Sequence, residues 1–199
     1  MNLFYLDADF DKCAEYHVDK HIVKMPLEVA QLMCTAVWVD KHLGFVPRAL
    51  NKEERDHLNA LKKDIKHLPM EERPLTPYLP MMYNHPCTIW VRSSLDNFEW
   101  THCYGNALND EYRYRYGKEH KSIVEVVNRL PELTRCLRVG FTTFGLAMPD
   151  ELKHYDNPIQ SYRNYYHLDK ATFATWKYRD RPHWWNDDYA DYEKRITAK

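Results

Sequence analysis

Six polar residues near the start of the chain carry groups with which enzymes move protons or attack a substrate. Apart from the neighbours Lys20 and His21, successive members are three or four positions apart, so on a helix they would form a single row. Imidazole, amine, carboxylate and amide groups in one row could supply general acid–base or nucleophilic catalysis. The row consists of His17, Lys20, His21, Lys24, Glu28 and Gln31.

The rest of this segment is apolar around most of its circumference. Apolar residues from Val18 to Ala36 recur at the i, i+4, i+7 spacing of a helical stripe. A helix with one polar row on an otherwise apolar surface is expected to line a cleft. Asp19 falls on the apolar side, where its carboxylate needs hydrogen-bond donors or a cation. Pro26 removes a main-chain donor and should kink the helix.

A metal site is the first alternative for the same row. His17 and His21 are four residues apart and could bind a metal ion, with Glu28 or His85 as the third ligand. The motif lacks the glutamate that follows the first histidine of a metalloprotease helix, and the neighbouring lysines would repel a dication. We therefore expect no metal. No glycine-rich phosphate loop or dinucleotide fingerprint occurs in the chain, so no cofactor is expected either.

Three further clusters combine aromatic rings with cations or amides. Arg and Lys can contact phosphates while Tyr and Trp stack on bases, so these clusters could bind a nucleic-acid strand. Tyr residues at helical spacing could equally be core. The candidate binding residues are Asn84, His85 and Trp90, then Tyr112, Arg113 and Tyr116, and finally Tyr162, Arg163, Tyr166 and Lys170.

The composition favours helices. The chain has 199 residues, of which 5 are Gly and 14% are aromatic, and this predicts compact helices rather than a sheet with many turns. We expect one mainly α domain over residues 1–199, with long Pro-rich and Gly-containing connecting loops.

Cap and breaker residues predict where the helices begin and end. The first helix, capped by Asp7 or Asp9, should follow a short strand or extended arm at 2–6 and run to about Trp38. The other helices are expected at 52–67, at 84–117 as the longest, at 122–130 and from 157, with connecting loops at 69–83 and 139–149.

The net charge of −1 does not by itself indicate a nucleic-acid-binding protein. Locally, however, residues 112–138 contain seven Lys or Arg against three Glu, so a basic cleft could exist. Five cysteines without CxxC pairs indicate reduced thiols. The N-terminus does not look like a signal peptide, and no apolar run approaches the length of a membrane span. We therefore expect a cytoplasmic protein without a membrane partner; the oligomeric state is not predicted.

Three short pieces of the chain together resemble the endonuclease V-type pyrimidine-dimer DNA glycosylases of T4-like phages. They are His17 on the first helix after a short arm, the Met25-Pro26 step, and the Tyr162-Arg163-Asn164-Tyr165-Tyr166 segment. The resemblance implies a small all-helical fold that excises a base from duplex DNA. It also implies an N-terminal α-amino nucleophile and a glutamate on the first helix.

Two positions depart from that family pattern. Asn2 is too large for ready removal of Met1, and Lys24 occupies the position of the family's glutamate. Glu28 or Asp19 would then activate water or stabilise the sugar cation, while His17 or His21 would protonate the leaving base. The two lysines of the row, Lys20 and Lys24, would bind phosphate or form an imine. The flipped base would need an aromatic slot, for which Trp90, Tyr112, Tyr162 and Tyr166 are candidates.

The sequence thus predicts a DNA glycosylase that flips out and removes a damaged or modified pyrimidine and leaves an abasic site. Its partner would be duplex DNA, in repair or in attack on hypermodified phage DNA. Two alternatives stay open. The same His/Lys/Glu row could modify free nucleobases or nucleotides, or the protein could bind DNA without catalysis.

Overall fold

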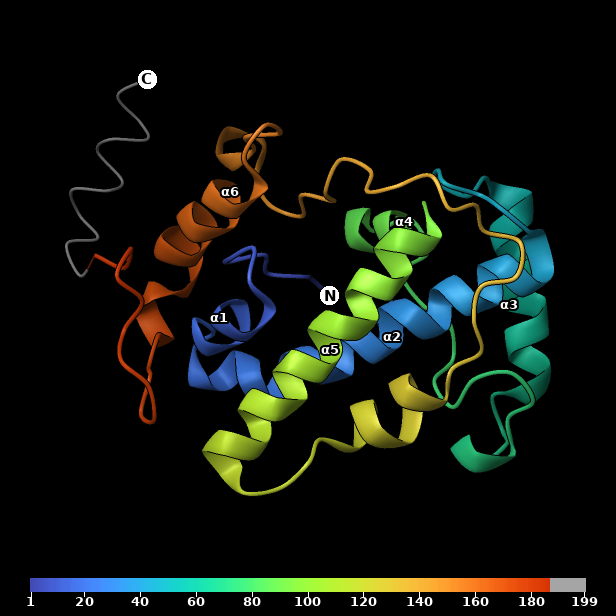
Figure 1. Cartoon of the computed structure of the whole chain (residues 1–199). Helices are drawn as coiled ribbons and strands as arrows, with labels where there is room; N and C mark the ends of the chain where they lie inside the picture. Colours follow the sequence, from blue (N-terminus) through green and yellow to red (C-terminus); the bar gives the residue numbers. More distant parts are fainter. Residues whose placement is uncertain (187–199) are drawn as a thin grey trace.

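The computed structural model describes residues 1–186, which contain helices and no strand (Figure 1). This confirms the mainly α fold class. Short π and 3-10 segments lie at Ser122–Val126, Val127–Arg129, Tyr166–Lys170 and Ala171–Phe173. The α-helices are α1 (Phe10–Glu15), α2 (Asp19–Leu43), α3 (Lys52–Ile65), α4 (Pro86–Val91), α5 (Leu95–Tyr116) and α6 (Pro158–Tyr165).

Helix α2 is the centre of the fold. It crosses the middle of the molecule behind α5, while α4 and α1 pack on either side of the crossing (Figure 1). Gly105 of α5 allows the two long helices to approach closely, because a Cβ at this position would lie 3.0 Å from Val29 Cγ1. The extended arm ahead of α1 forms no strand, and its Leu3, Phe4 and Leu6 enter the same core.

By length and composition α2 could cross a membrane, contrary to the expectation that no segment approaches that length. However, 78% of its most apolar window is buried inside the protein, which is the behaviour of a core helix.

The first helix is interrupted, so the prediction of one continuous helix to about Trp38 was wrong. Asp9 caps α1 as expected, since its side chain accepts a hydrogen bond from the Lys12 main-chain N–H. The chain then leaves the helical conformation, and Val18 is extended at φ −61°, ψ 152°. The helix therefore restarts at Asp19, and His17 lies in the break rather than on α2.

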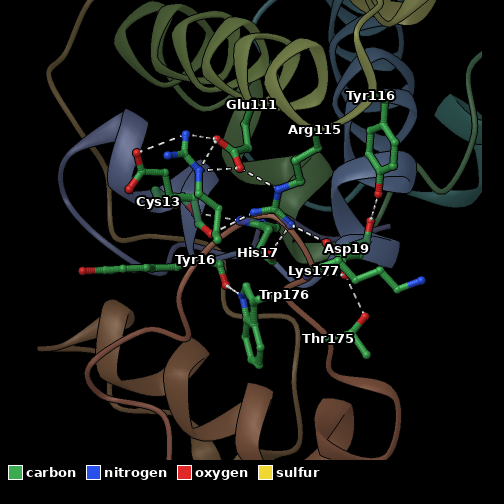
Figure 2. Close-up of polar contacts among 12 residues, drawn as sticks. Cys13, Tyr16, His17, Asp19, Glu111, Arg115, Tyr116, Thr175, Trp176 and Lys177 are labelled. Carbon is green, nitrogen blue, oxygen red and sulfur yellow. Dashed lines mark hydrogen bonds and ion pairs between the residues drawn. The ribbon is translucent and has the colours of Figure 1, made fainter.

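A buried guanidinium explains this break (Figure 2). Arg115 of α5 donates to the carbonyl oxygens of Glu15 and His17, at 2.9 and 3.0 Å, where α1 has ended. It also donates to Asp19 Oδ1 at 3.0 Å and to a Glu111 carboxylate oxygen at 2.5 Å. These contacts satisfy main-chain acceptors that a continuous helix would have used internally.

A second break divides the helix expected at 84–117. The chain leaves α4 at Arg92, whose guanidinium donates to the carbonyl oxygens of Val46, Tyr83 and Arg48. Ser94 then caps α5, with its hydroxyl oxygen accepting from the Asn97 N–H at 3.0 Å. Consequently α2, at 25 residues, is the longest helix in the described part of the chain.

Most of the other expected bounds agree with the structure. Gly117 ends α5 in the left-handed conformation at φ 68°, and Asn157 caps α6 with Pro158 in its first turn. Asn51 closes a capping box at the start of α3. The helix expected at 122–130 consists of π and 3-10 turns.

Replacing Arg115 with Met should lower the free energy of unfolding by about 3–5 kcal/mol, because it removes one member of a buried charge cluster and leaves carbonyls and carboxylates without a donor. Arg113→Met is the matched control: Arg113 is on the same helix end, but its side chain is 56% exposed. Its effect should stay within about 0.5 kcal/mol. Urea unfolding of both variants measures the difference, and equal losses would contradict the assigned role of Arg115.

Stability should fall as the pH is lowered from 7 to 5. Burial lowers the pKa of His17 to about 3 and that of His21 to about 2, whereas in the unfolded chain both titrate near 6.5. The unfolded state then binds more protons, at up to about 1.4 kcal/mol per pH unit for each histidine. Urea unfolding at several pH values measures the slope. His17→Gln should have a shallower slope than the unchanged protein, and an unchanged slope would exclude His17 as a source.

Candidate functional site

Glu28 supplies the carboxylate of the polar row on α2. It is buried, and its Oε2 accepts a hydrogen bond from the main-chain N–H of Asn2 at 2.7 Å. The Met1 amino group lies 3.9 Å from the same oxygen, and Lys24 Nζ lies 2.9 Å from Oε1. A carboxylate, an α-amino group and a lysine amine therefore meet at one point. We call these groups the Glu28 centre.

The last helix holds the N-terminal arm in place over this centre. The Asn2 side-chain oxygen accepts from the Tyr162 hydroxyl at 2.9 Å, and the Asn2 amide donates to the Ala147 carbonyl at 3.0 Å. At the other end of the arm, Arg163 donates to the Leu6 carbonyl at 2.8 Å and pairs with Asp7. Two adjacent residues of α6 thus fix both ends of the arm.

His85 adds an imidazole beside the Glu28 centre. Its Nδ1 accepts from the Cys87 N–H at 3.2 Å, so the neutral ring carries its proton on Nε2 and can donate from there. Burial lowers the pKa of His85 to about 4, and the positive amino terminus lowers it further while Glu28 opposes the shift. His85 is therefore neutral at physiological pH.

The other end of the polar row lies against the segment that follows α6. His21 Nδ1 is 2.5 Å from the Tyr166 hydroxyl, and the His21 ring stacks on Phe4 with centroids 4.6 Å apart. Lys170 Nζ lies 4.7 Å from the centre of the Tyr165 ring. On α2, Lys20 Nζ lies 4.9 Å from the Phe173 ring centre in the same way. Amines and partly exposed rings thus alternate along this end of the row.

Chemically, this arrangement combines a general base with cations for an anionic ligand. Glu28 could activate water or stabilise a developing positive charge, and the neutral His85 could donate a hydrogen bond. The exposed amine of Lys20 could contact a phosphate directly, whereas those of Lys24 and Lys170 would exchange their pairing with Glu28 and Asp169 for it.

His17 and Asp19 lie apart from the Glu28 centre. His17 donates from Nδ1 to the Cys13 carbonyl at 2.6 Å, and its Nε2 is 2.9 Å from the Tyr104 hydroxyl, in a fully buried position. Asp19 accepts from Arg115, from the Thr175 hydroxyl at 2.8 Å and from the Lys177 N–H at 3.0 Å (Figure 2). Asp19 therefore has the donors that its apolar position required, and both residues hold the α1–α2 break.

The rings expected to hold a flipped base are largely buried. Trp90 is 3% exposed, and Tyr162 and Tyr166 are fully buried, so none of them offers a free face to a base. Tyr112 packs on His120 and on Tyr116, whose hydroxyl donates to the Asp19 carbonyl.

The remaining candidates are divided between the site and the scaffold. Gln31 lies one turn beyond Glu28 on α2 and is partly exposed. The Asn84 side chain is engaged with the main chain of Leu50, and Arg113 forms exposed ion pairs with Asp110 and Glu119. These contacts place Asn84 and Arg113 outside the Glu28 centre.

Sequence reasoning missed several residues that the structure brings to the polar row. Phe4, Tyr165 and Phe173 supply rings there, and Asn2 supplies a main-chain donor to Glu28. The alternation of side chains along the extended arm could have predicted part of this, because Asn2 and Phe4 then lie on the same side of the arm. No local pattern could have paired the arm with residues 165–173, since this contact depends on the tertiary fold.

Among residues 1–186, no three His, Cys, Asp or Glu side chains lie together as a metal site would require. In particular, His17 and His21 are both engaged with tyrosine hydroxyls.

Comparisons of this chain with protein-family models, with curated proteins and with solved structures gave no match.

Proposed function

We propose that the protein is a DNA glycosylase that removes a damaged or modified pyrimidine at the Glu28 centre. The observation that supports this most is the meeting of a buried carboxylate, the Met1 amino group, Lys24 and the neutral His85. Cleavage of an N-glycosidic bond needs a negative group near the sugar, because positive charge develops there, and a donor for the departing base. Glu28 and His85 have these two chemistries.

In the hydrolytic form of the reaction, Glu28 takes a proton from water as the water oxygen bonds to the sugar C1′. The bond from C1′ to the base breaks with its electron pair moving to the base, which accepts a hydrogen bond from His85 Nε2 and takes its proton from solvent. The products are a free base and an abasic site. Lys20 and Lys170 would contact the flanking phosphates, while Tyr165 and Phe173 have the partly exposed rings on which a base could stack.

An amine could replace water in this scheme. Attack by the Met1 amine or by Lys24 on C1′ would displace the base and, with loss of a proton and opening of the sugar ring, form an imine. Such an intermediate permits strand cleavage and can be reduced by borohydride to a stable covalent adduct.

Chemistry on free nucleotides is the second candidate. The net charge is −1, and the cations near Glu28 are a few amines at one end of α2 rather than a broad basic face. This charge distribution suits a small anionic substrate better than a long duplex.

Glu28→Gln should reduce release of the nucleobase by about 10²–10⁴-fold, because it removes the general base but keeps a side-chain oxygen that accepts from the Asn2 N–H. The assay uses end-labelled duplexes with a pyrimidine dimer, uracil, 5-hydroxymethylcytosine or its glucosylated form, read with and without hot alkali. Asp19→Asn is the control: it should lower the free energy of unfolding, while the fraction that remains folded should release the nucleobase at the unchanged rate. If no nucleobase is released from any duplex but a free nucleotide is chemically modified, the second candidate is favoured. DNA binding without either reaction would indicate a non-catalytic protein.

Lys24→Met tests which nucleophile acts. If Lys24 forms an imine, borohydride should trap the unchanged protein on the duplex, and the variant should lose at least about tenfold of this trapping. Lys41→Met is the matched control, since Lys41 is an exposed lysine at the far end of the same helix. Trapping that survives in Lys24→Met would assign the imine to another amine, and absence of trapping with alkali-dependent breaks would indicate attack by water.

A further inference from the structure

A hollow of about 480 Å³ has His85 in its wall, and the charges of Glu28 and of the amino terminus act on this histidine. The hollow lies between α3 and the loop that leads into α4. Among residues 1–186, no carboxylate lines it. The lining residues are Arg55, Asn59, Met82, Tyr83, Asn84 and His85.

Three side chains of this wall have hydrogen-bond donors to spare. Arg55 donates from Nε to the Asn51 carbonyl at 3.2 Å, and its two terminal nitrogens have no hydrogen-bond partner among residues 1–186. Asn59 accepts from the Tyr83 hydroxyl at 3.1 Å, which leaves its NH₂ group as a donor. His85 accepts on Nδ1 and therefore presents N–H at Nε2.

The main chain at the rim of the hollow is strained. Met82 has φ +48°, a left-handed conformation that costs free energy for a residue with a side chain. It is held there because its carbonyl accepts from the His85 N–H at 3.0 Å, while Arg92 binds the next carbonyl at 2.8 Å. Strained residues of this kind cluster at ligand-binding sites.

We propose that this hollow binds a phosphate group of the substrate, next to the unit that reacts at Glu28. A guanidinium, an amide NH₂ and an imidazole N–H without a neighbouring carboxylate match an anion rich in acceptor oxygens. Arg55 supplies the positive charge, while Asn59 and His85 supply oriented hydrogen-bond donors that fix the position of the phosphate. The amines of Lys20 and Lys170 lie toward the opposite end of α2, so the substrate would be held on both sides of Glu28.

This inference rests on the proposed function for the nature of the substrate, but binding of phosphate can be measured without catalysis. The full-length, ¹⁵N-labelled protein is titrated with inorganic phosphate, thymidine 5′-monophosphate, thymidine and duplex DNA. Side-chain signals of Arg55, Asn59 and His85 report on the hollow. Phosphate and the monophosphate should shift these signals to saturation, and thymidine should not.

Two substitutions test the donors. Arg55→Gln should weaken phosphate binding about tenfold, the loss expected for one charge-assisted hydrogen bond. Asn59→Asp keeps an acceptor for the Tyr83 hydroxyl but adds negative charge, so it should weaken binding at least as much. Arg129→Gln and Asn128→Asp make the same changes at exposed positions outside the hollow and should leave the affinity unchanged.

The outcomes separate the sources of the phosphate. If duplex DNA shifts the same signals and Arg55→Gln weakens its binding, the group belongs to a strand; if only the monophosphate does so, the substrate is a free nucleotide. The proposal is overturned if phosphate shifts none of these signals, or if Arg55→Gln binds phosphate as tightly as Arg129→Gln. Phosphate binding without base release from any duplex would disprove the glycosylase but support the phosphate subsite. Base release without phosphate binding in the hollow would support the glycosylase and disprove the subsite.

Discussion

The contact on which the described structure most depends is the guanidinium of Arg115 in the space between α1, α2 and α5. A buried cation is costly unless it is paired with anions and hydrogen-bonded, and Arg115 makes four hydrogen bonds. Here two donors go to carbonyls at the end of α1 and two go to the carboxylates of Asp19 and Glu111. Asp19 in turn binds Thr175 and Lys177, so the same charge cluster also fastens the chain after α6. One cation therefore joins segments that are about a hundred residues apart in the sequence.

The Glu28 centre depends on this framework indirectly. The arm reaches Glu28 because Tyr162 and Arg163 hold it at both ends, and α6 is positioned by its own contacts with the core. Gly145 takes part, because its carbonyl accepts from Tyr162 and a Cβ there would lie 2.8 Å from the Pro86 carbonyl oxygen. Close approach of this loop to α4 thus brings the arm, the Tyr162 hydroxyl and His85 to one side of α2.

Local sequence rules predicted the fold class and many helix ends, because capping and termination are local physics. Asp9, Asn157 and Gly117 act as their residue types suggest. The two breaks were not predictable in this way. Each depends on an arginine, Arg115 or Arg92, that is distant in sequence from most of the carbonyls it binds.

The candidate site was predictable to a similar extent. The row from Lys20 to Gln31 could be read from helical spacing. Its Glu28 and His21 do face other parts of the chain, whereas Lys24 pairs with Glu28 on the same helix. Tyr162 and Tyr166 are a different case, since aromatic content cannot distinguish a ring that meets a ligand from one that fills the core. Both fill the core and use their hydroxyl groups to orient Asn2 and His21.

The hydrogen bond from Tyr162 to Asn2 joins residues 160 positions apart. During synthesis the arm is made well before its anchor on α6, so a nascent chain carries Glu28 and Lys24 before the arm can be held over them. Contacts of such sequence separation form late, because a long loop must close before they stabilise the chain. The Glu28 centre can therefore assemble only after α6 has been made, and a chain that ends before α6 would lack it.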